Sequence, residues 1–248
     1  MTYLQAIFLG IIQGLTEFFP VSSSAHLKMV KLFLGIDKSE FLFFDLICHM
    51  GTLLALIGFF RKELFKLILT PRHWGYYFLA LIPLIPTYFL LKTYVLSLAP
   101  LFGGFLFITG IFLYLASKSQ SAPLPYKKKR HVLCIGIMQS MALIPGISRS
   151  GTTIATACMQ GWEMKKAVEF SFFLAIPTII GGTLLEGVKA YKDTSFVYLP
   201  FTTYFLGFLF SFIFGLLAVS LIARISRKML KVFAWYCMGM GILSLFYF

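Results

Sequence analysis

Charged residues are scarce in this chain of 248 residues: 12% are Asp, Glu, Lys or Arg, and only nine are acidic. A soluble domain is about one quarter charged and about half apolar, so a chain that is 59% hydrophobic cannot cover a water-facing surface. The same figures exclude a disordered chain, which needs low hydrophobicity and many charges. We therefore expect an integral membrane protein.

Cysteine is also scarce, and its four residues stand singly in apolar stretches, at Cys48, Cys134, Cys158 and Cys237. No two of them have the CxxC spacing of a zinc or redox motif, and so few cysteines in a chain of this length exclude a disulfide scaffold. We interpret them as small buried hydrophobic residues.

Long apolar runs, in contrast, are abundant. About 20 apolar residues cross a bilayer as a helix. The runs here are continuous, whereas the strands of a membrane β-barrel alternate apolar and polar residues. The sequence thus predicts an all-α, polytopic integral membrane protein. The predicted apolar segments are residues 3–19, 24–36, 41–60, 74–92, 100–117, 131–145, 151–162, 167–185, 200–222 and 230–248.

Basic residues outnumber acidic ones, 22 against nine, which gives a net charge of +13. They gather between apolar segments at residues 61–72, 118–130 and 224–231. This pattern is typical of cytoplasmic loops, and we prefer that interpretation to a nucleic-acid site. With all three clusters in the cytoplasm, both chain ends are expected on the outer side of the membrane.

An internal repeat divides the chain. Residues 13–24 and 139–150 both run from Gln through Pro to Ser, at an offset of 126 (139 − 13). We therefore divide a single membrane domain, 1–248, into a first repeat 1–117, a cytoplasmic basic linker 118–130 and a second repeat 131–248.

The repeats also predict a topology. Segment 151–162 is too short to span a bilayer at 1.5 Å per residue. Each repeat is therefore expected to hold one re-entrant helix pair and three full spans. Because three is odd, the second repeat is inverted relative to the first. The expected architecture is an inverted-topology repeat with two re-entrant pairs and about six full spans.

The first polar cluster lies in the first repeat. Gln13 and Glu17 stand four residues apart and share one helix face. Pro20 is expected to end that helix, and the serines at 22–24 to cap the next one, which carries His26. An ionisable residue inside a membrane segment costs about 2.5–3.5 kcal/mol. Several in one short stretch therefore predict a functional site.

The second polar cluster, residues 148–153, follows Pro145 and contains Arg149 and Gly151. Glycine permits close approach of the backbone to a ligand, a helix N-terminus offers free N–H groups, and arginine binds phosphate oxygens in a bidentate manner. The cluster lacks the Lys-Ser/Thr of a nucleotide-binding loop, so ATP and GTP are not expected.

If the two clusters meet near the middle of the bilayer, they combine an anion pocket with Glu17 and His26, which supply acid–base or metal chemistry. This favours cleavage of a phosphate ester or anhydride. A secondary transporter or a flippase with a midplane anion site is the alternative. His49 has two open interpretations: it pairs with Asp45 across one helix turn, or it lines the cavity.

Three stretches carry a resemblance to a known family: QGLTEFFPVSSSAH at 13–26, PGISRSGTT at 145–153 and EFSFFLAIP at 169–177. With these motifs the chain resembles, over essentially its whole length, the undecaprenyl-diphosphate phosphatases, bacterial membrane enzymes associated with bacitracin resistance. The resemblance implies hydrolysis of the C55 prenyl diphosphate to the monophosphate, which recycles the lipid carrier of peptidoglycan synthesis in the bacterial cytoplasmic (inner) membrane. The implied partners are the prenyl lipid and the bilayer, and the flippase alternative would carry a polyprenyl phosphate. The sequence leaves the oligomeric state open, with a homodimer as one alternative.

The resemblance also implies roles for single residues. Glu17, His26 and Arg149 are the expected catalytic residues, and Ser23 is the expected nucleophile or phosphate ligand. A divalent cation, Mg²⁺ or Ca²⁺, is expected at Glu17 and Gln13. Many members have Glu where this chain has Gln13, Gly is common at position 25, which is Ala here, and Gln is frequent at position 49, which is His here. The expected substrate-binding residues are Ser22, Ser148, Ser150, Gly151, Thr153 and Gln139.

Overall fold

The computed structural model describes residues 1–36, 42–91, 94–121, 128–192 and 199–247, and within these ranges every regular element is a helix. The all-α prediction is therefore confirmed. Part of the predicted linker, residues 122–127, lies outside the described ranges. The helices are α1 (Tyr3–Phe18), α2 (Ser23–Phe33), α3 (Leu42–Phe59), α4 (Arg61–Ile68), η1 (Pro71–His73), α5 (Trp74–Leu81), α6 (Leu84–Leu91), α7 (Val95–Leu98), η2 (Ala99–Leu101), α8 (Phe102–Lys118), α9 (Lys129–Met141), α10 (Arg149–Met159), α11 (Met164–Lys192), α12 (Phe201–Ile222), η3 (Arg227–Met229) and α13 (Leu230–Tyr247).

Several of these helices have the length and apolar character of membrane spans. Among the described residues there are five: Leu42–Phe59, Pro71–Leu91, Met164–Lys189, Phe201–Ile222 and Arg227–Tyr247. A shorter apolar helix, Phe102–Lys118, has 17 residues. The chain is therefore a multi-pass membrane protein, as its composition predicts.

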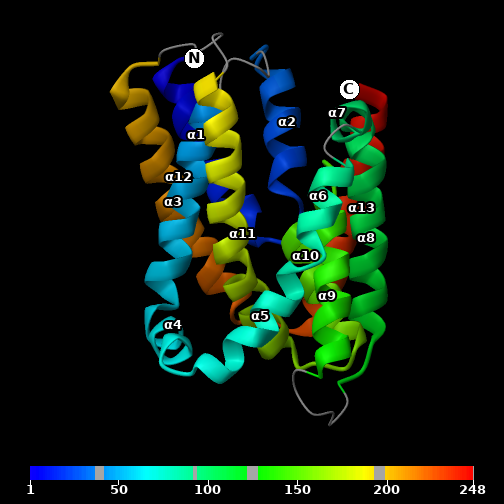
Figure 1. The fold of residues 1–248 in the computed structure, drawn as a ribbon. Coiled ribbons are helices and arrows are strands. Elements are labelled where there is room, and N and C mark those ends of the chain that lie inside the picture. Colours follow the sequence, from blue (N-terminus) through cyan, green and yellow to red (C-terminus); the bar gives the residue numbers. More distant parts are fainter. Residues whose placement is uncertain (37–41, 92–93, 122–127, 193–198, 248) are drawn as a thin grey trace.

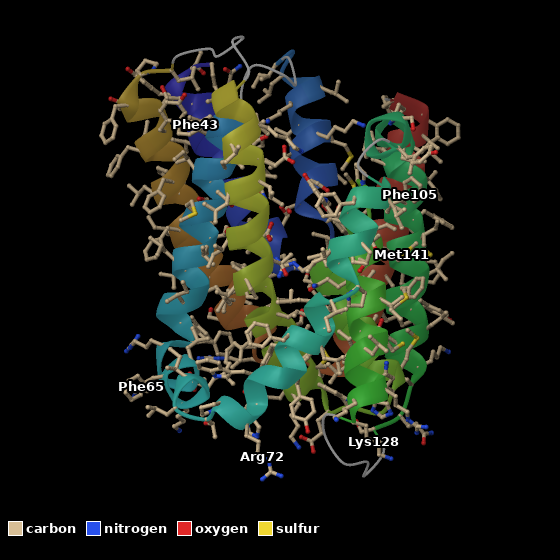
Figure 2. The ribbon with its side chains drawn as sticks, viewed as in Figure 1. Phe43, Phe65, Arg72, Phe105, Lys128 and Met141 are labelled. Carbon is tan, nitrogen blue, oxygen red and sulfur yellow. The ribbon has the colours of Figure 1, made fainter. Side chains whose placement is uncertain are left out.

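The helices run roughly parallel to one long axis (Figure 1). Both chain ends lie at one end of the molecule, whereas α4, the last residues of α8 and the first residues of α9 lie at the other (Figure 1). Figure 2 places Arg72 and Lys128, from two of the basic clusters, at that second end. These two labelled basic residues thus lie at the end of the molecule opposite the termini.

Two helix pairs, α1–α2 and α9–α10, are each joined by a short turn. α1 and α2 form one pair in the half that contains the termini, and α9 enters from the opposite end and turns into α10 (Figure 1). Figure 2 shows Met141, the last residue of α9, about midway along the molecule, well above Lys128. The two turns, residues 19–22 and 142–148, therefore lie in the interior.

Small residues hold α1 closely against α12. A Cβ atom on Gly10 would lie 2.7 Å from the carbonyl oxygen of Gly207, and one on Gly14 would lie 2.8 Å from that of Ser211. Membrane helices associate through such small residues, because lipid supplies no hydrophobic force between helices. The contact fixes the axis and rotation of α1, which carries Glu17 on the turn after Gly14.

Candidate active site

The two polar clusters meet at a buried ion pair. Arg149 Nη2 lies 2.6 Å from Glu17 Oε1, although the two residues are 132 positions apart. Beside this pair, the Ser150 hydroxyl donates to the carbonyl of Phe19 at 3.0 Å. The Glu17 side chain is only 7% exposed. The end of α1 thus supplies a carboxylate and a carbonyl, and the start of α10 supplies the guanidinium and the hydroxyl that bind them.

The second carboxylate oxygen of Glu17 accepts two further hydrogen bonds. The Ser23 hydroxyl donates to Oε2 at 2.7 Å, and Gln13 Nε2 donates to it at 3.1 Å. His49 Nε2 lies 3.8 Å from the same oxygen. Glu17 is thus the centre of the site, and Ser23 is the hydroxyl that it can deprotonate.

The turn between α1 and α2 has an unusual backbone. Ser22 adopts φ 67°, and its side chain makes no capping hydrogen bond to α2. The prediction that serines cap this helix is therefore wrong for Ser22. The conformation is held through the Ser22 carbonyl, which accepts from both His26 N, at 3.2 Å, and His26 Nδ1, at 2.8 Å. The Ser22 side chain therefore does not cap the first N–H groups of α2, and uncapped N–H groups at a helix N-terminus can bind an anion.

His26 is held on both ring nitrogens. Because Nδ1 donates to a carbonyl, neutral His26 accepts at Nε2, where the Tyr236 hydroxyl lies 2.7 Å away. Tyr236 lies on α13, and the sequence analysis did not identify it. A single tyrosine in an apolar helix gives no signal in the sequence, since its hydroxyl finds His26 only through tertiary packing.

The turn between α9 and α10 is shaped by glycine and by α8. Gly146 has φ 99°, and a Cβ atom there would lie 2.2 Å from the carbonyl oxygen of Phe102. The Thr109 hydroxyl of α8 accepts from Ser148 N at 3.1 Å. Ser148 Oγ in turn caps α10 by accepting from Gly151 N at 3.0 Å. The loop is therefore fixed before any ligand arrives.

Three predicted phosphate ligands already have protein partners. Ser148 caps α10, and Ser150 binds the Phe19 carbonyl. The Thr153 hydroxyl lies 2.6 Å from that of Ser171 on α11. The hydrogen bonds of these hydroxyls stabilise the backbone and helices around the site. Arg149, by contrast, keeps one donor available, because its buried Nη1 has no acceptor in the described part of the chain.

Gln139 is buried, yet the structure gives it no hydrogen bond to Glu17 or Arg149. Neither polar atom of its amide has a partner among the described residues. Gln13, its counterpart in the repeat, bonds to a carboxylate one helix turn later. The equivalent position after Gln139 is Leu143 (17 + 126), so Gln139 has no such partner nearby on its own helix.

The structure decides between the two interpretations of His49. The Asp45 carboxylate pairs with Lys31 of α2 at 2.5 Å. His49 instead donates from Nδ1 to the backbone carbonyl of Asp45 at 2.7 Å. His49 therefore lines the site and faces Glu17, and the side-chain pair across the helix turn is not formed.

The oxygen donors suit a cation that is shared with a phosphate ligand. Among the described residues no group of three or more His, Cys, Asp or Glu side chains is placed to form a metal site. Glu17 nevertheless offers a carboxylate, and the buried Oε1 of Gln13 has no partner in the described ranges. Since Mg²⁺ is usually bound by one or two carboxylates together with substrate phosphates, the residues present fit such an ion.

The chain is similar to known proteins over its full length. The family described as bacitracin resistance protein BacA matches residues 6–243. An undecaprenyl-diphosphatase from Protochlamydia amoebophila is 37% identical over 261 residues, covering 100% of this chain and 99% of the relative. One from Methanobrevibacter smithii is 35% identical, with 98% and 96% covered. One from Halothermothrix orenii is also 35% identical, with 98% and 97% covered.

Proposed function

Because the chain belongs to the bacitracin resistance protein BacA family, and because its full-length relatives are named undecaprenyl-diphosphatases, we propose that it hydrolyses undecaprenyl diphosphate to undecaprenyl phosphate and inorganic phosphate. The observation that carries the proposal is the contact among Ser23, Glu17 and Arg149. It joins a hydroxyl nucleophile, a proton acceptor and a phosphate-binding cation in one buried place. A transporter or flippase is not favoured.

These contacts support the following sequence of steps. Ser23 Oγ attacks the terminal phosphorus, its proton passes to Glu17 Oε2, and the bond from this phosphorus to the bridging oxygen breaks, releasing the prenyl monophosphate. Water then attacks the phosphoserine, and Glu17 returns its proton to Ser23 while it takes one from the water. Arg149 Nη1 and the first N–H groups of α2 bind the phosphate oxygens, whose charge increases in the transition state.

Glu17 and Gln13 would hold the divalent cation. When bound, the ion neutralises charge on the diphosphate. Glu17 already binds Arg149. Its carboxylate would therefore orient both positively charged groups that bind the diphosphate, the guanidinium and the cation.

We place the chain in the bacterial cytoplasmic membrane as an inverted repeat whose re-entrant pairs are α1–α2 and α9–α10. The offset of 126 that relates Gln13 to Gln139 also relates Gly10 to Gly136. Gly10 packs against the backbone of Gly207 on α12. Gly136 packs against the backbone of Ala80 on α5, since a Cβ atom on Gly136 would lie 2.4 Å from the carbonyl oxygen of Ala80. Equivalent positions thus make equivalent close contacts, which supports the repeat.

The function is tested by phosphate release from undecaprenyl diphosphate with purified protein in detergent and Mg²⁺. We expect turnover by the wild-type chain, and a loss of about 100-fold or more for Arg149→Ala. A transporter would release no phosphate in this assay, and its transport activity would have to be measured in a sealed vesicle. Turnover that is unchanged in a folded Arg149→Ala variant would refute the site. Orientation is tested separately by reporters fused after the last residue. A reporter that works only outside the cytoplasm should be active there, and one that works only in the cytoplasm should be inactive.

A further inference from the structure

The orientation of His49 is fixed by its own helix. Nδ1 lies 2.7 Å from the Asp45 carbonyl oxygen, and since a carbonyl can only accept, Nδ1 carries the proton. Neutral His49 therefore presents the lone pair of Nε2. A histidine whose other nitrogen donates to a backbone carbonyl is the usual form of a metal-binding histidine, because that hydrogen bond fixes the tautomer and the ring orientation.

The Nε2 lone pair faces the Glu17 carboxylate. The 3.8 Å between Nε2 and Glu17 Oε2 is too long for a hydrogen bond. It is shorter than about 4.2 Å, the span of two ligands that each lie about 2.1 Å from one ion. The separation of the two atoms is therefore compatible with a single metal ion bound to both.

Gln13 supplies an independent sign of a ligand at the same place. Its side chain is fully buried, Nε2 donates to Glu17 Oε2, and Oε1 has no donor within the described residues. An unpaired buried amide oxygen costs free energy unless something binds it. A cation beside Glu17 would satisfy this oxygen.

We propose that His49 Nε2 is a ligand of the divalent cation at Glu17 and Gln13, and that the site consequently prefers Mn²⁺ over Mg²⁺. Nitrogen ligands favour transition metals, whereas Mg²⁺ is bound almost entirely through oxygen. This inference deepens the proposed function and rests on it for the role of the cation, since the substrate phosphates would complete the coordination.

The competing explanation is an ordinary ion pair between protonated His49 and Glu17. That explanation gives Nε2 a proton and leaves no lone pair for a metal. It also leaves Gln13 Oε1 without a partner among the described residues. The two explanations differ in a property that needs no turnover, namely how tightly the protein binds Mn²⁺ in the absence of substrate.

Three proteins are compared in detergent after removal of any histidine tag: wild type, His49→Gln and His73→Gln. His73 is exposed on η1 in the basic cluster at the end opposite the termini, so it serves as a matched control. Free Mn²⁺ is measured by its electron paramagnetic resonance signal during a titration, and the melting temperature is measured with Mn²⁺ and with Mg²⁺.

We expect His49→Gln to weaken Mn²⁺ binding about tenfold or more, a loss that outer-shell substitutions alone can cause, and to abolish the Mn²⁺-dependent rise in melting temperature. Mg²⁺ binding should change much less, because glutamine still offers an oxygen. His73→Gln should behave as wild type. The proposal is overturned if His49→Gln binds Mn²⁺ as the wild type does, or if both variants lose the same affinity.

A second measurement keeps the test decisive if His49→Gln is unstable. Pulsed electron paramagnetic resonance of Mn²⁺ bound to the wild-type protein should show modulation from a directly bound imidazole nitrogen. A spectrum without this nitrogen modulation would overturn the proposal. The proposed function fails by a different result: a chain that binds Mn²⁺ through His49 but releases no phosphate would keep this site and lose the enzyme assignment.

Discussion

Neutralising Glu17 should destabilise the fold as well as stop the reaction. Glu17→Gln leaves Arg149, which is 14% exposed, without its counter-charge, and Arg149 Nη1 already lacks an acceptor among the described residues. Breaking a buried ion pair by removing one partner costs about 3–5 kcal/mol. Because Arg149 keeps some exposure, we expect the lower end, about 3 kcal/mol. Arg149→Met should cost a similar amount, since it strands the carboxylate instead.

The double variant, Glu17→Gln with Arg149→Met, decides whether this reasoning holds. It removes both charges together, and replacing a whole buried pair is often neutral. We therefore expect the double variant to be more stable than either single variant, with a coupling free energy of about 2 kcal/mol or more. The measurement is unfolding of the purified proteins in mixed micelles against increasing denaturing detergent, with phosphate release measured on the same samples.

Activity and stability should separate in this cycle. All three variants should lose phosphate release by about 100-fold or more, because each lacks a group that acts on the transferring phosphate. Only the double variant should regain stability. If the two single losses simply add in the double variant, the ion pair does not couple α1 to α10. If the double variant regains activity, Glu17 and Arg149 are not catalytic.

The remaining predictions concern neighbours of this pair. Ser23→Ala should lower kcat about 100-fold or more with little change in KM, measured by phosphate release, and an unchanged kcat would favour water as the nucleophile. Tyr236→Phe should lower kcat/KM about fivefold, the value of one hydrogen bond, and should shift the pH profile, because His26 loses its Nε2 partner. Gly14→Ala should destabilise the fold by about 1–3 kcal/mol through overpacking against α12. The control Gly58→Ala, where no atom of the described residues lies within 4 Å of the new Cβ, should be neutral or slightly stabilising in the same unfolding assay.

Most helices follow directly from the apolar segments, because a span must satisfy its own backbone in lipid. The segment predicted at 200–222 is α12 at Phe201–Ile222, and that predicted at 151–162 is α10 at Arg149–Met159. The short helix α4, Arg61–Ile68, was not predicted. Its basic residues mark it as a loop by composition, whereas its helical form depends on local backbone bonding.

The candidate site was predictable from the sequence where it contains charged residues in apolar segments. Burying the charges of Glu17 and Arg149 in an apolar environment costs free energy, so their presence there indicates function. Tyr236 and Thr109 carry no charge and cost little in a membrane helix. The contact of Tyr236 with His26 and that of Thr109 with Ser148 depend on how α13 and α8 pack, which no local sequence pattern records. The conformation of Ser22 was missed for a related reason, since its carbonyl is held by the side chain of His26.

The buried ion pair makes assembly of the fold and assembly of the site one event. The carboxylate comes from the α1–α2 pair, and the guanidinium comes from α10. Either half alone would hold its charge in an apolar environment at a cost of about 2.5–3.5 kcal/mol, and the contact between them offsets part of that cost for both. In the mechanism that we propose, the groups that draw the helix pairs together are also the groups that act on the diphosphate. A substitution that breaks this pair should therefore lower both stability and activity, so the fold and the proposed chemistry constrain the same two residues.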